Sequence, residues 1–151
     1  MAIPTQLTEL TGRWQGPNSL WLTPSEPVRE SLATAVCQPV AQGKFFELRY
    51  TWADGGQPQE GVLLLGQSQE QLDAAWVDSW HMQDSMMHCS GSAADGIVSV
   101  QGSYAAPPSP DWGWRITLQP DSNEQFRLIM HNITPDGDEM VAVEAVFTRE
   151  A

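Results

Sequence analysis

The sequence predicts an all-β protein in which about ten antiparallel strands follow one another up and down after a short N-terminal helix. Short runs of aliphatic, β-branched and aromatic residues alternate with turn residues along almost the whole chain. No helical pattern between these runs is long enough for the crossover that parallel strands need. A chain of 151 residues is expected to form one domain, 1–151.

The helix is expected at Pro4 to Thr11. Leu7 and Leu10 are three residues apart, Thr5 is a candidate N-cap, and a glycine follows the segment. A short helix of this kind suits a position across the mouth of a barrel.

The strands are separated by residues with clear turn chemistry. Asp54-Gly55-Gly56, Asp95-Gly96 and Asp136-Gly137 are typical of tight hairpins, which need a positive backbone φ. An external loop is expected at Ala105 to Asp111, because the three prolines in it cannot donate to a strand ladder. The expected strands are 12–22, 28–37, 44–53, 60–67, 71–79, 85–91, 97–104, 112–119, 124–133 and 139–149.

Strand alternation predicts which side chains share a face and so which are candidates for the interior. The four inward sets are rich in aromatic and aliphatic residues. They are Phe46, Leu48, Tyr50 and Trp52; Leu72, Ala74, Trp76, Asp78 and Trp80; Trp112, Trp114, Ile116 and Leu118; and Val141, Val143, Ala145, Phe147 and Arg149.

The charge balance excludes polyanionic partners. The chain has 19 acidic and 7 basic residues, a formal net charge of -12, so nucleic acid and anionic membrane surfaces would repel it. No stretch approaches the roughly 20 apolar residues of a membrane span, and the N-terminus lacks a secretory pattern. We therefore expect a cytoplasmic protein in which Cys37 and Cys89 are reduced thiols.

Several motifs occur in a fixed order along the chain. They are G-R-W-Q-G at 12–16, A-Q-G-K-F-F at 41–46, E-G-V-L-L-L-G at 60–66, W-V-D-S-W at 76–80, Gly91, and V-F-T-R at 146–149. In this order they resemble an uncharacterised bacterial domain family of the calycin (lipocalin-like) superfamily, related in fold to fatty-acid-binding proteins and nitrobindins. The resemblance covers nearly the whole chain and implies a closed antiparallel up-and-down barrel.

The resemblance also implies how one end of the barrel is closed, and it implies no activity. In lipocalin-type barrels an Arg of the last strand covers a Trp of the first strand, and Arg149 and Trp14 match those positions. The family has no assigned chemistry. Family members often have Gly-Tyr-Asp after the E-G segment, whereas this chain has Gly66-Gln67-Ser68.

The segment Trp76 to Cys89 contains most of the residues capable of chemistry. Metal-ligand types occur in it at Asp78, His81, Asp84 and His88, but their spacing matches no recognised zinc or iron motif, so no metal is expected. We interpret His81 and Asp84 as solvated turn residues.

The same segment supplies candidates for the interior. Met82, Met86 and Met87 are suited to filling irregular space. His88 lies within an expected strand and is the better candidate for pointing into a cavity, with a backbone-satisfied histidine as the alternative.

No cofactor is expected, although the resemblance offers haem as an alternative. Nitrobindin-like barrels hold haem through one histidine, and His131 is the candidate here, but strand parity sets it opposite the apolar residues Leu128 and Met130. A ligand carboxylate could be bound by an inward arginine. Parity instead places the candidates on the outer face, paired with acids; they are Arg49, Arg115 and Arg127.

The sequence contains no nucleophile elbow and no phosphate-binding loop, so an enzyme is the less favoured reading. We expect a barrel that binds a small, largely apolar, possibly carboxylate-bearing molecule. The expected lining is Tyr50, Trp52, Trp76, Trp80, Met86, His88 and Trp114. The alternatives are an enzyme that uses the same cavity, a haem-binding barrel, and a ligand-free barrel that buries some of its seven tryptophans in a homodimer.

Overall fold

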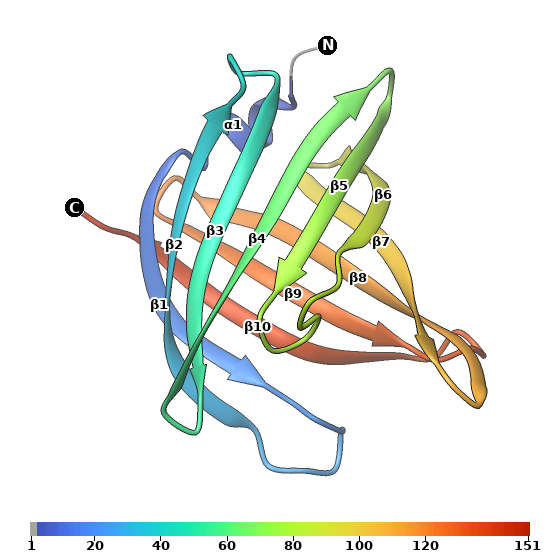
Figure 1. Cartoon of the computed structure of the whole chain (residues 1–151). Coiled ribbons are helices and arrows are strands. Elements are labelled where there is room, and N and C mark those ends of the chain that lie inside the picture. The colour runs from blue at the N-terminus through green and yellow to red at the C-terminus, as the bar shows by residue number, and fades with distance from the viewer. Residues whose placement is uncertain (1–2) are drawn as a thin grey trace.

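The computed structural model describes residues 3–151, which form one closed barrel of antiparallel strands with a short helix at one end (Figure 1). Around the barrel the strand order is β1-β10-β9-β8-β7-β6-β5-β4-β3-β2. The elements are α1 (Thr5–Thr8), β1 (Gly12–Leu20), β2 (Arg29–Val40), β3 (Phe45–Asp54), β4 (Gln57–Ser68), β5 (Gln71–Asp78), β6 (Met87–Ala94), β7 (Ile97–Ala106), β8 (Ser109–Ser122), β9 (Gln125–Ile133) and β10 (Glu139–Arg149).

The predicted fold class is confirmed. Each strand pairs with its neighbour in sequence, and β1 pairs with β10 to close the barrel. The three predicted hairpin turns are present, with φ of 57° at Gly55, 79° at Gly96 and 94° at Gly137. Short turns between consecutive strands leave antiparallel pairing as the available arrangement, which is why the order around the barrel follows the order in sequence.

The barrel interior is built from alternate residues, as strand geometry requires. In β3, the residues from Phe46 to Trp52 alternate between buried and solvent-facing, and the partner strand places Leu63 opposite Leu48 on the inner side. Both leucines are at most 1% exposed. The apolar residues of one parity therefore form a continuous core inside the sheet.

The second glycine of the G-x-W-x-G motif has a structural role in closing the barrel. A Cβ on Gly16 would lie 1.8 Å from the carbonyl oxygen of Val146 in β10, a distance that no side chain tolerates. The next residue, Pro17, has no amide hydrogen to donate to a strand partner. β1 therefore crosses β10 closely at this point, and only glycine fits there.

The N-terminal helix differs from its expected form. It spans Thr5–Thr8 rather than Pro4 to Thr11, and the N-cap position is Pro4, without a side-chain capping bond. Thr5 is therefore not the N-cap. No helix within residues 3–151 is long and apolar enough to cross a membrane.

Two expectations about the strands were wrong. The segment from Ala105 to Asp111 is not an external loop, because β7 and β8 pair up to Ala106 and Ser109 and turn at Pro107–Pro108. Those prolines occupy the turn, where an amide donor is not needed. In β10 a register shift between Val141 and Val143 leaves Val141 42% exposed and buries Ala142 instead. An extra residue in a strand reverses the facing beyond it.

Candidate functional site

The two ends of the barrel differ. We call the end that carries α1 the closed end. There the guanidinium of Arg149 lies 4.2 Å from the centre of the Trp14 ring. Arg149 also donates hydrogen bonds to the carbonyl oxygens of Glu9, Thr11 and Asn123, at 2.9, 2.7 and 2.9 Å. One side chain thus ties the segment after α1 to the turn between β8 and β9.

The aromatic residues beneath Arg149 complete the closed end. The Trp14 indole N–H donates to the Leu10 carbonyl oxygen at 2.8 Å. Phe126 meets the Trp14 ring edge-on at 4.7 Å and stacks on Phe147 at 5.1 Å. These three aromatic side chains are fully buried. The closed end is therefore solidly packed.

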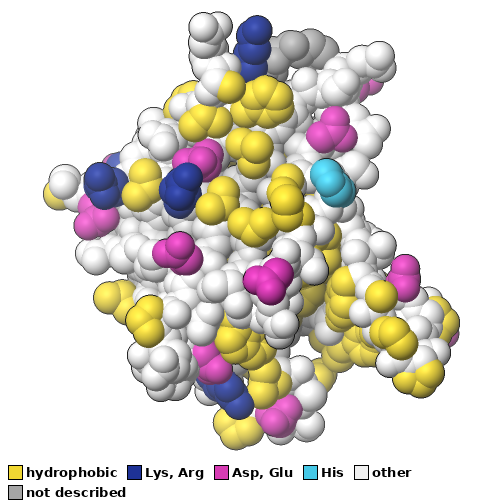
Figure 2. Space-filling model, viewed as in Figure 1, with side chains coloured by type: hydrophobic (Ala, Val, Ile, Leu, Met, Phe, Trp, Pro, Cys, Tyr) yellow, Lys and Arg dark blue, Asp and Glu magenta, His cyan; other side chains and the backbone are white. Residues whose placement is uncertain are grey.

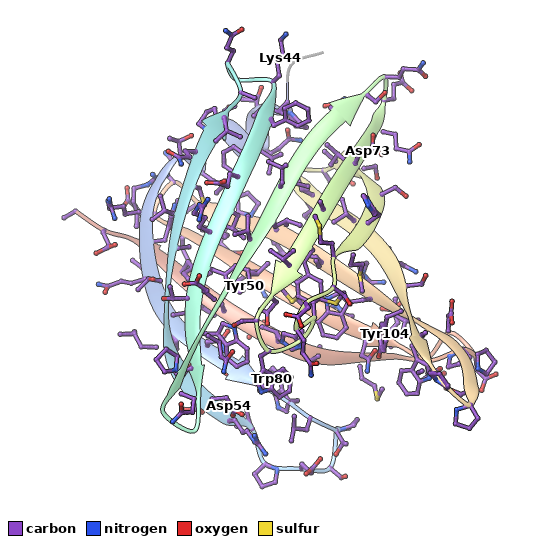
Figure 3. The ribbon with its side chains drawn as sticks, in the orientation of Figure 1. Lys44, Tyr50, Asp54, Asp73, Trp80 and Tyr104 are labelled. Atoms are coloured by element: carbon purple, nitrogen blue, oxygen red, sulfur yellow. The ribbon has the colours of Figure 1, made fainter. Side chains whose placement is uncertain are left out.

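A cavity of about 650 Å³ occupies the opposite end, which we call the open end. Trp80 and Tyr104, which both line it, lie away from α1 in Figure 3. Figure 2 shows a hollow with hydrophobic side chains on its walls, beside the lobe where the β7–β8 hairpin projects. The lining is Leu20, Trp21, Leu22, Thr23, Pro24, Trp76, Trp80, His81, Met82, Gln83, Ser85, Met86, Met87, Ser103, Tyr104, Ala105, Trp114, Asn132, Met140, Val141 and Ala142.

The lining combines aromatic, aliphatic and thioether side chains with seven neutral polar ones, which are Thr23, His81, Gln83, Ser85, Ser103, Tyr104 and Asn132. Among the described residues that line the cavity there is no Asp, Glu, Lys or Arg. Tyr104 donates a hydrogen bond to Asn132 Oδ1 at 2.6 Å, which fixes one polar pair on the wall. Burial raises the pKa of Tyr104, so its hydroxyl stays protonated at neutral pH.

Asp78, the last residue of β5, organises the turn at the base of the cavity. Its Oδ1 accepts hydrogen bonds from the backbone N–H groups of Trp80 and His81, both at 2.8 Å. An aspartate that captures the amides two and three residues ahead folds the chain into a tight turn. This turn directs the chain after β5 back across the mouth of the barrel and brings both residues into the cavity wall.

The other carboxylate oxygen of Asp78 is held by two side chains of β3, which lies beyond β4 in the sheet. Oδ2 accepts hydrogen bonds from the Tyr50 hydroxyl at 2.6 Å and from the Trp52 indole N–H at 3.3 Å. Tyr50 in turn accepts from the Trp76 indole N–H at 2.9 Å. Asp78 is only 2% exposed, and four donors compensate the carboxylate for its loss of water.

A glycine makes room for this network. A Cβ on Gly61 would lie 2.3 Å from both Cζ and Oη of Tyr50, which sits opposite it in the β3–β4 pairing. Burial raises the pKa of Tyr50 well above its ordinary value, and the nearby Asp78 raises it further. The phenol therefore remains a hydrogen-bond donor to Asp78.

His81 is enclosed by four tryptophans. Its ring centre lies 5.6 Å from that of Trp52, 5.8 Å from Trp76, 4.7 Å from Trp80 and 5.2 Å from Trp114. Burial among these rings lowers the pKa of the imidazole, and the negative charge of Asp78 opposes that effect only in part. His81 is therefore a neutral imidazole at neutral pH.

A second, much smaller cavity lies behind His81. Its volume is about 10 Å³, and His81 lines both this inner cavity and the large one. Asn18, Tyr50, Trp52 and Asp78 also line it, and its remaining walls are apolar. The inner cavity has about the size and polarity that one buried water needs.

Trp114 contributes a buried donor without an acceptor. Its ring stacks on Trp76 at 5.5 Å with an interplanar angle of 12°. Its Nε1 is sealed from solvent and has no hydrogen-bond partner among residues 3–151. An unpartnered buried N–H destabilises the folded state, so this part of the wall is not optimised for stability.

The expected lining residues divide into three groups. Trp76, Trp80 and Trp114 line the large cavity, and Met86 lies at its rim with 62% of its surface exposed. Tyr50 and Trp52 line the inner cavity instead. The expectation that His88 points inward was wrong, because His88 is exposed between the buried Met87 and Cys89. That a ligand binds at the first two groups remains a prediction.

The histidine in the cavity is His81, which we had interpreted as a solvated turn residue; that interpretation was wrong. The signal that could have located it is Asp78 on the inward parity of β5, followed at two and three residues by Trp80 and His81. An inward aspartate at a strand end captures the following amides and so directs the turn inward.

The other candidate residues lie outside the cavity. Asp84 and His88 are exposed, and within residues 3–151 no three His, Cys, Asp or Glu side chains form a group that could hold a metal ion. His131 lies on the outer parity of β9, opposite Arg115 of β8, which contradicts a haem held inside the barrel by this residue. Burial and the Arg115 charge both lower the pKa of His131.

The three strand arginines also face outward. Arg49 pairs with Glu47, Arg115 with Glu139, and Arg127 with Asp121, and all of these pairs are partly or largely exposed. Those arginines therefore do not reach a ligand inside the barrel.

Both cysteines are free and buried. Burial raises the pKa of Cys37 to about 12 and that of Cys89 to about 11, so both are unreactive thiols at neutral pH.

Comparison with known proteins places the chain in a family. The model of a family described as a protein of unknown function, DUF1579, matches residues 4–149. The chain belongs to this family. The fold is similar to that of a crystal structure of Rv2717c from M. tuberculosis, with a TM-score of 0.63, 13% identity and full coverage of both chains. A redesigned β-barrel is similar at a TM-score of 0.47 and 14% identity, also over both whole chains. No curated protein matches this chain.

Proposed function

We propose that this DUF1579 protein binds a small, largely apolar and uncharged molecule in the cavity at its open end. The observation that carries the proposal is the cavity of about 650 Å³, walled by aromatic, aliphatic and thioether side chains with seven neutral polar ones. This volume is within the range of known small-molecule sites, about 300–1,000 Å³. The packed closed end supports the same reading, since it leaves the open end as the route of entry.

The lining favours an uncharged ligand over a carboxylate. A buried carboxylate needs a cation or several donors to replace its water. None of the described lining residues is Arg or Lys, and the strand arginines are paired on the outside. The one titratable cation candidate, His81, is neutral, and Asp78 lies just behind it. A fatty acid would therefore bind less well than its alcohol.

The hydrogen bonds of Asp78 favour a binding role for the cavity over a catalytic one. Its two oxygens accept four hydrogen bonds that hold the turn and the base of the cavity. A carboxylate committed to four donors is a poor general base. The enzyme alternative thus lacks the free acid or base that it would require, other than His81.

The fold and the cysteines also support inferences about the superfamily and the cellular compartment. We infer membership of the calycin superfamily from the closed ten-strand barrel, the helix at one end and the Trp14–Arg149 contact. We infer a reducing compartment, such as the cytoplasm, from the two buried free thiols.

A matched pair of ligands tests the proposal. The purified protein is titrated with a long-chain fatty alcohol and with the fatty acid of the same chain length, and tryptophan fluorescence reports binding. The alcohol is expected to saturate a single site and the acid to bind more weakly at neutral pH. Native mass spectrometry of the protein as purified would identify any small molecule already bound.

Two tryptophan variants provide the control. Trp80→Ala removes a wall of the cavity and is expected to weaken binding of the alcohol, whereas Trp112→Ala removes a tryptophan that lies outside the lining. Equal effects of the two substitutions would contradict binding in this cavity. Tighter binding of the acid than of the alcohol would contradict the uncharged ligand class.

A further inference from the structure

His81 combines a fixed position with unused hydrogen-bonding capacity. Its backbone N–H is held by Asp78, and its ring is packed among four tryptophans. Asp78 is itself fixed by Tyr50 and Trp52. A side chain held from several directions before a ligand arrives loses little freedom when it binds one.

The ring of this histidine lines both cavities. The hydrogen bond found for His81 within residues 3–151 is the one from its backbone N–H to Asp78 Oδ1, and the sealed side-chain atoms without a partner in that range are Trp114 Nε1 and His131 Nδ1. A neutral imidazole carries one donor N–H and one acceptor nitrogen. His81 therefore brings both kinds of hydrogen-bonding atom to the wall, whose other polar side chains are Thr23, Gln83, Ser85, Ser103, Tyr104 and Asn132.

The inner cavity gives the ring a polar neighbour on its far side. Asn18 is 5% exposed and lines the inner cavity. Together with the Asp78 carboxylate and the Tyr50 hydroxyl, its side chain lines a space of about 10 Å³ beside His81. One water there would meet enough polar groups to be held, and it would also contact the imidazole.

We propose that His81 is the hydrogen-bonding contact that selects a hydrophobic alcohol or phenol as the ligand, with the ring reaching the ligand hydroxyl from the base of the large cavity. A hydroxyl can donate and accept, so it pairs with a neutral imidazole in either tautomer. The apolar remainder of the ligand packs against Trp76, Trp80 and the methionines of the wall. This inference rests on the proposed function and names the ligand class of the same site.

Two flat fluorescent probes of nearly equal size differ by one hydroxyl, so the difference in their affinities measures what the hydroxyl contributes to binding. 1-Pyrenemethanol carries an uncharged hydroxyl, and 1-methylpyrene lacks it. Energy transfer from tryptophan to pyrene reports binding of either probe. For the wild-type protein we expect 1-pyrenemethanol to bind about threefold to tenfold more tightly, the ratio that one neutral hydrogen bond supplies.

Substitutions at position 81 test whether the imidazole causes this ratio of affinities. His81→Phe keeps a flat ring among the tryptophans but removes both hydrogen-bonding atoms, so 1-pyrenemethanol should then bind no more tightly than 1-methylpyrene. His81→Gln restores a neutral donor and acceptor and should recover part of the preference. His88→Gln changes an exposed histidine outside the cavity and should leave the ratio as in the wild type.

The outcomes separate this inference from the proposed function. Tight binding of both probes with no preference in the wild type would overturn the role of His81 and leave cavity binding intact. A preference that persists in His81→Phe would also overturn it. If neither probe binds, the proposed function fails and this inference fails with it. Should His81→Phe not fold, a shift of the His81 ring resonances with 1-pyrenemethanol but not with 1-methylpyrene decides the point.

Discussion

Tryptophan side chains lie at both ends of the barrel, but the N–H of Trp14 at the closed end is hydrogen-bonded, whereas that of Trp114 at the open end has no partner among the described residues. At the closed end the Trp14 N–H is hydrogen-bonded, its ring is covered by Arg149, and Phe126 packs against it. At the open end Trp114 has a buried N–H without a partner among the described residues, and the His81 ring lines the cavity. A buried N–H without an acceptor lowers the stability of the folded protein. The comparison supports the proposal that the closed end stabilises the barrel and that the open end, with its cavity, binds a ligand.

The largest expected effect comes from truncating a tryptophan at each end. Trp14→Ala removes a fully buried ring and should destabilise the protein by about 3–5 kcal/mol. Trp80→Ala removes a partly buried ring at the rim and should cost about 1 kcal/mol, while it weakens ligand binding. Urea unfolding measures both changes. Similar losses of stability in the two variants would break the comparison between the ends.

A smaller effect is expected from adding one methyl group to β4. Gly61→Ala would place a Cβ 2.3 Å from the buried Tyr50 phenol, and relieving that clash should cost about 1–3 kcal/mol and disturb the Asp78 turn. Gly66→Ala is the control, because its Cβ would meet Phe45, a ring that is 42% exposed and free to move. Ligand affinity and urea stability should both fall for Gly61→Ala and change little for Gly66→Ala. The reverse order would show that the Tyr50–Asp78 contact does not support the cavity.

The smallest expected effect is a pH dependence of stability. Burial lowers the pKa of His81 below its ordinary value of 6.5, so between the two values the unfolded chain binds a proton that the folded protein does not. Stability is therefore complete above about pH 6.5 and falls as the pH decreases through that value. The pKa of His131 is lowered too, so His81→Phe should reduce this slope without abolishing it.

Thermal unfolding across mildly acidic pH checks this expectation. A slope that is unchanged in His81→Phe would mean that the imidazole is solvated rather than enclosed by the tryptophans.

The fold was predictable from the sequence because its signals are local. Strand alternation and the Asp-Gly turns specify ten antiparallel strands, and the parity of β3 and β5 correctly places Tyr50, Trp52, Trp76 and Asp78 inside. Each of these signals depends on residues that are close together in the chain.

The site was predictable only in part, because some of its residues, such as Trp80 and His81, lie in the turn between β5 and β6. Alternation gives no facing once a strand ends, so the sequence predicts His81 as a solvated turn residue, although it places Trp80 and Met86 of the same segment in the lining. His88, in contrast, was assigned by its strand position, but the register of β6 turns Met87 and Cys89 inward and leaves His88 outside. The facing of a turn depends on which distant groups it meets, here Tyr50 and Trp52 around Asp78.

The most direct test of the account follows the indole N–H resonances of the seven tryptophans while 1-pyrenemethanol is added to the wild-type protein. Binding at the open end should shift or broaden the signals of Trp76, Trp80 and Trp114, and it should leave Trp14 at the closed end unchanged. Shifts centred on Trp14, or a saturable binding signal without any shift of the three cavity tryptophans, would contradict the claim that the open end is the binding site.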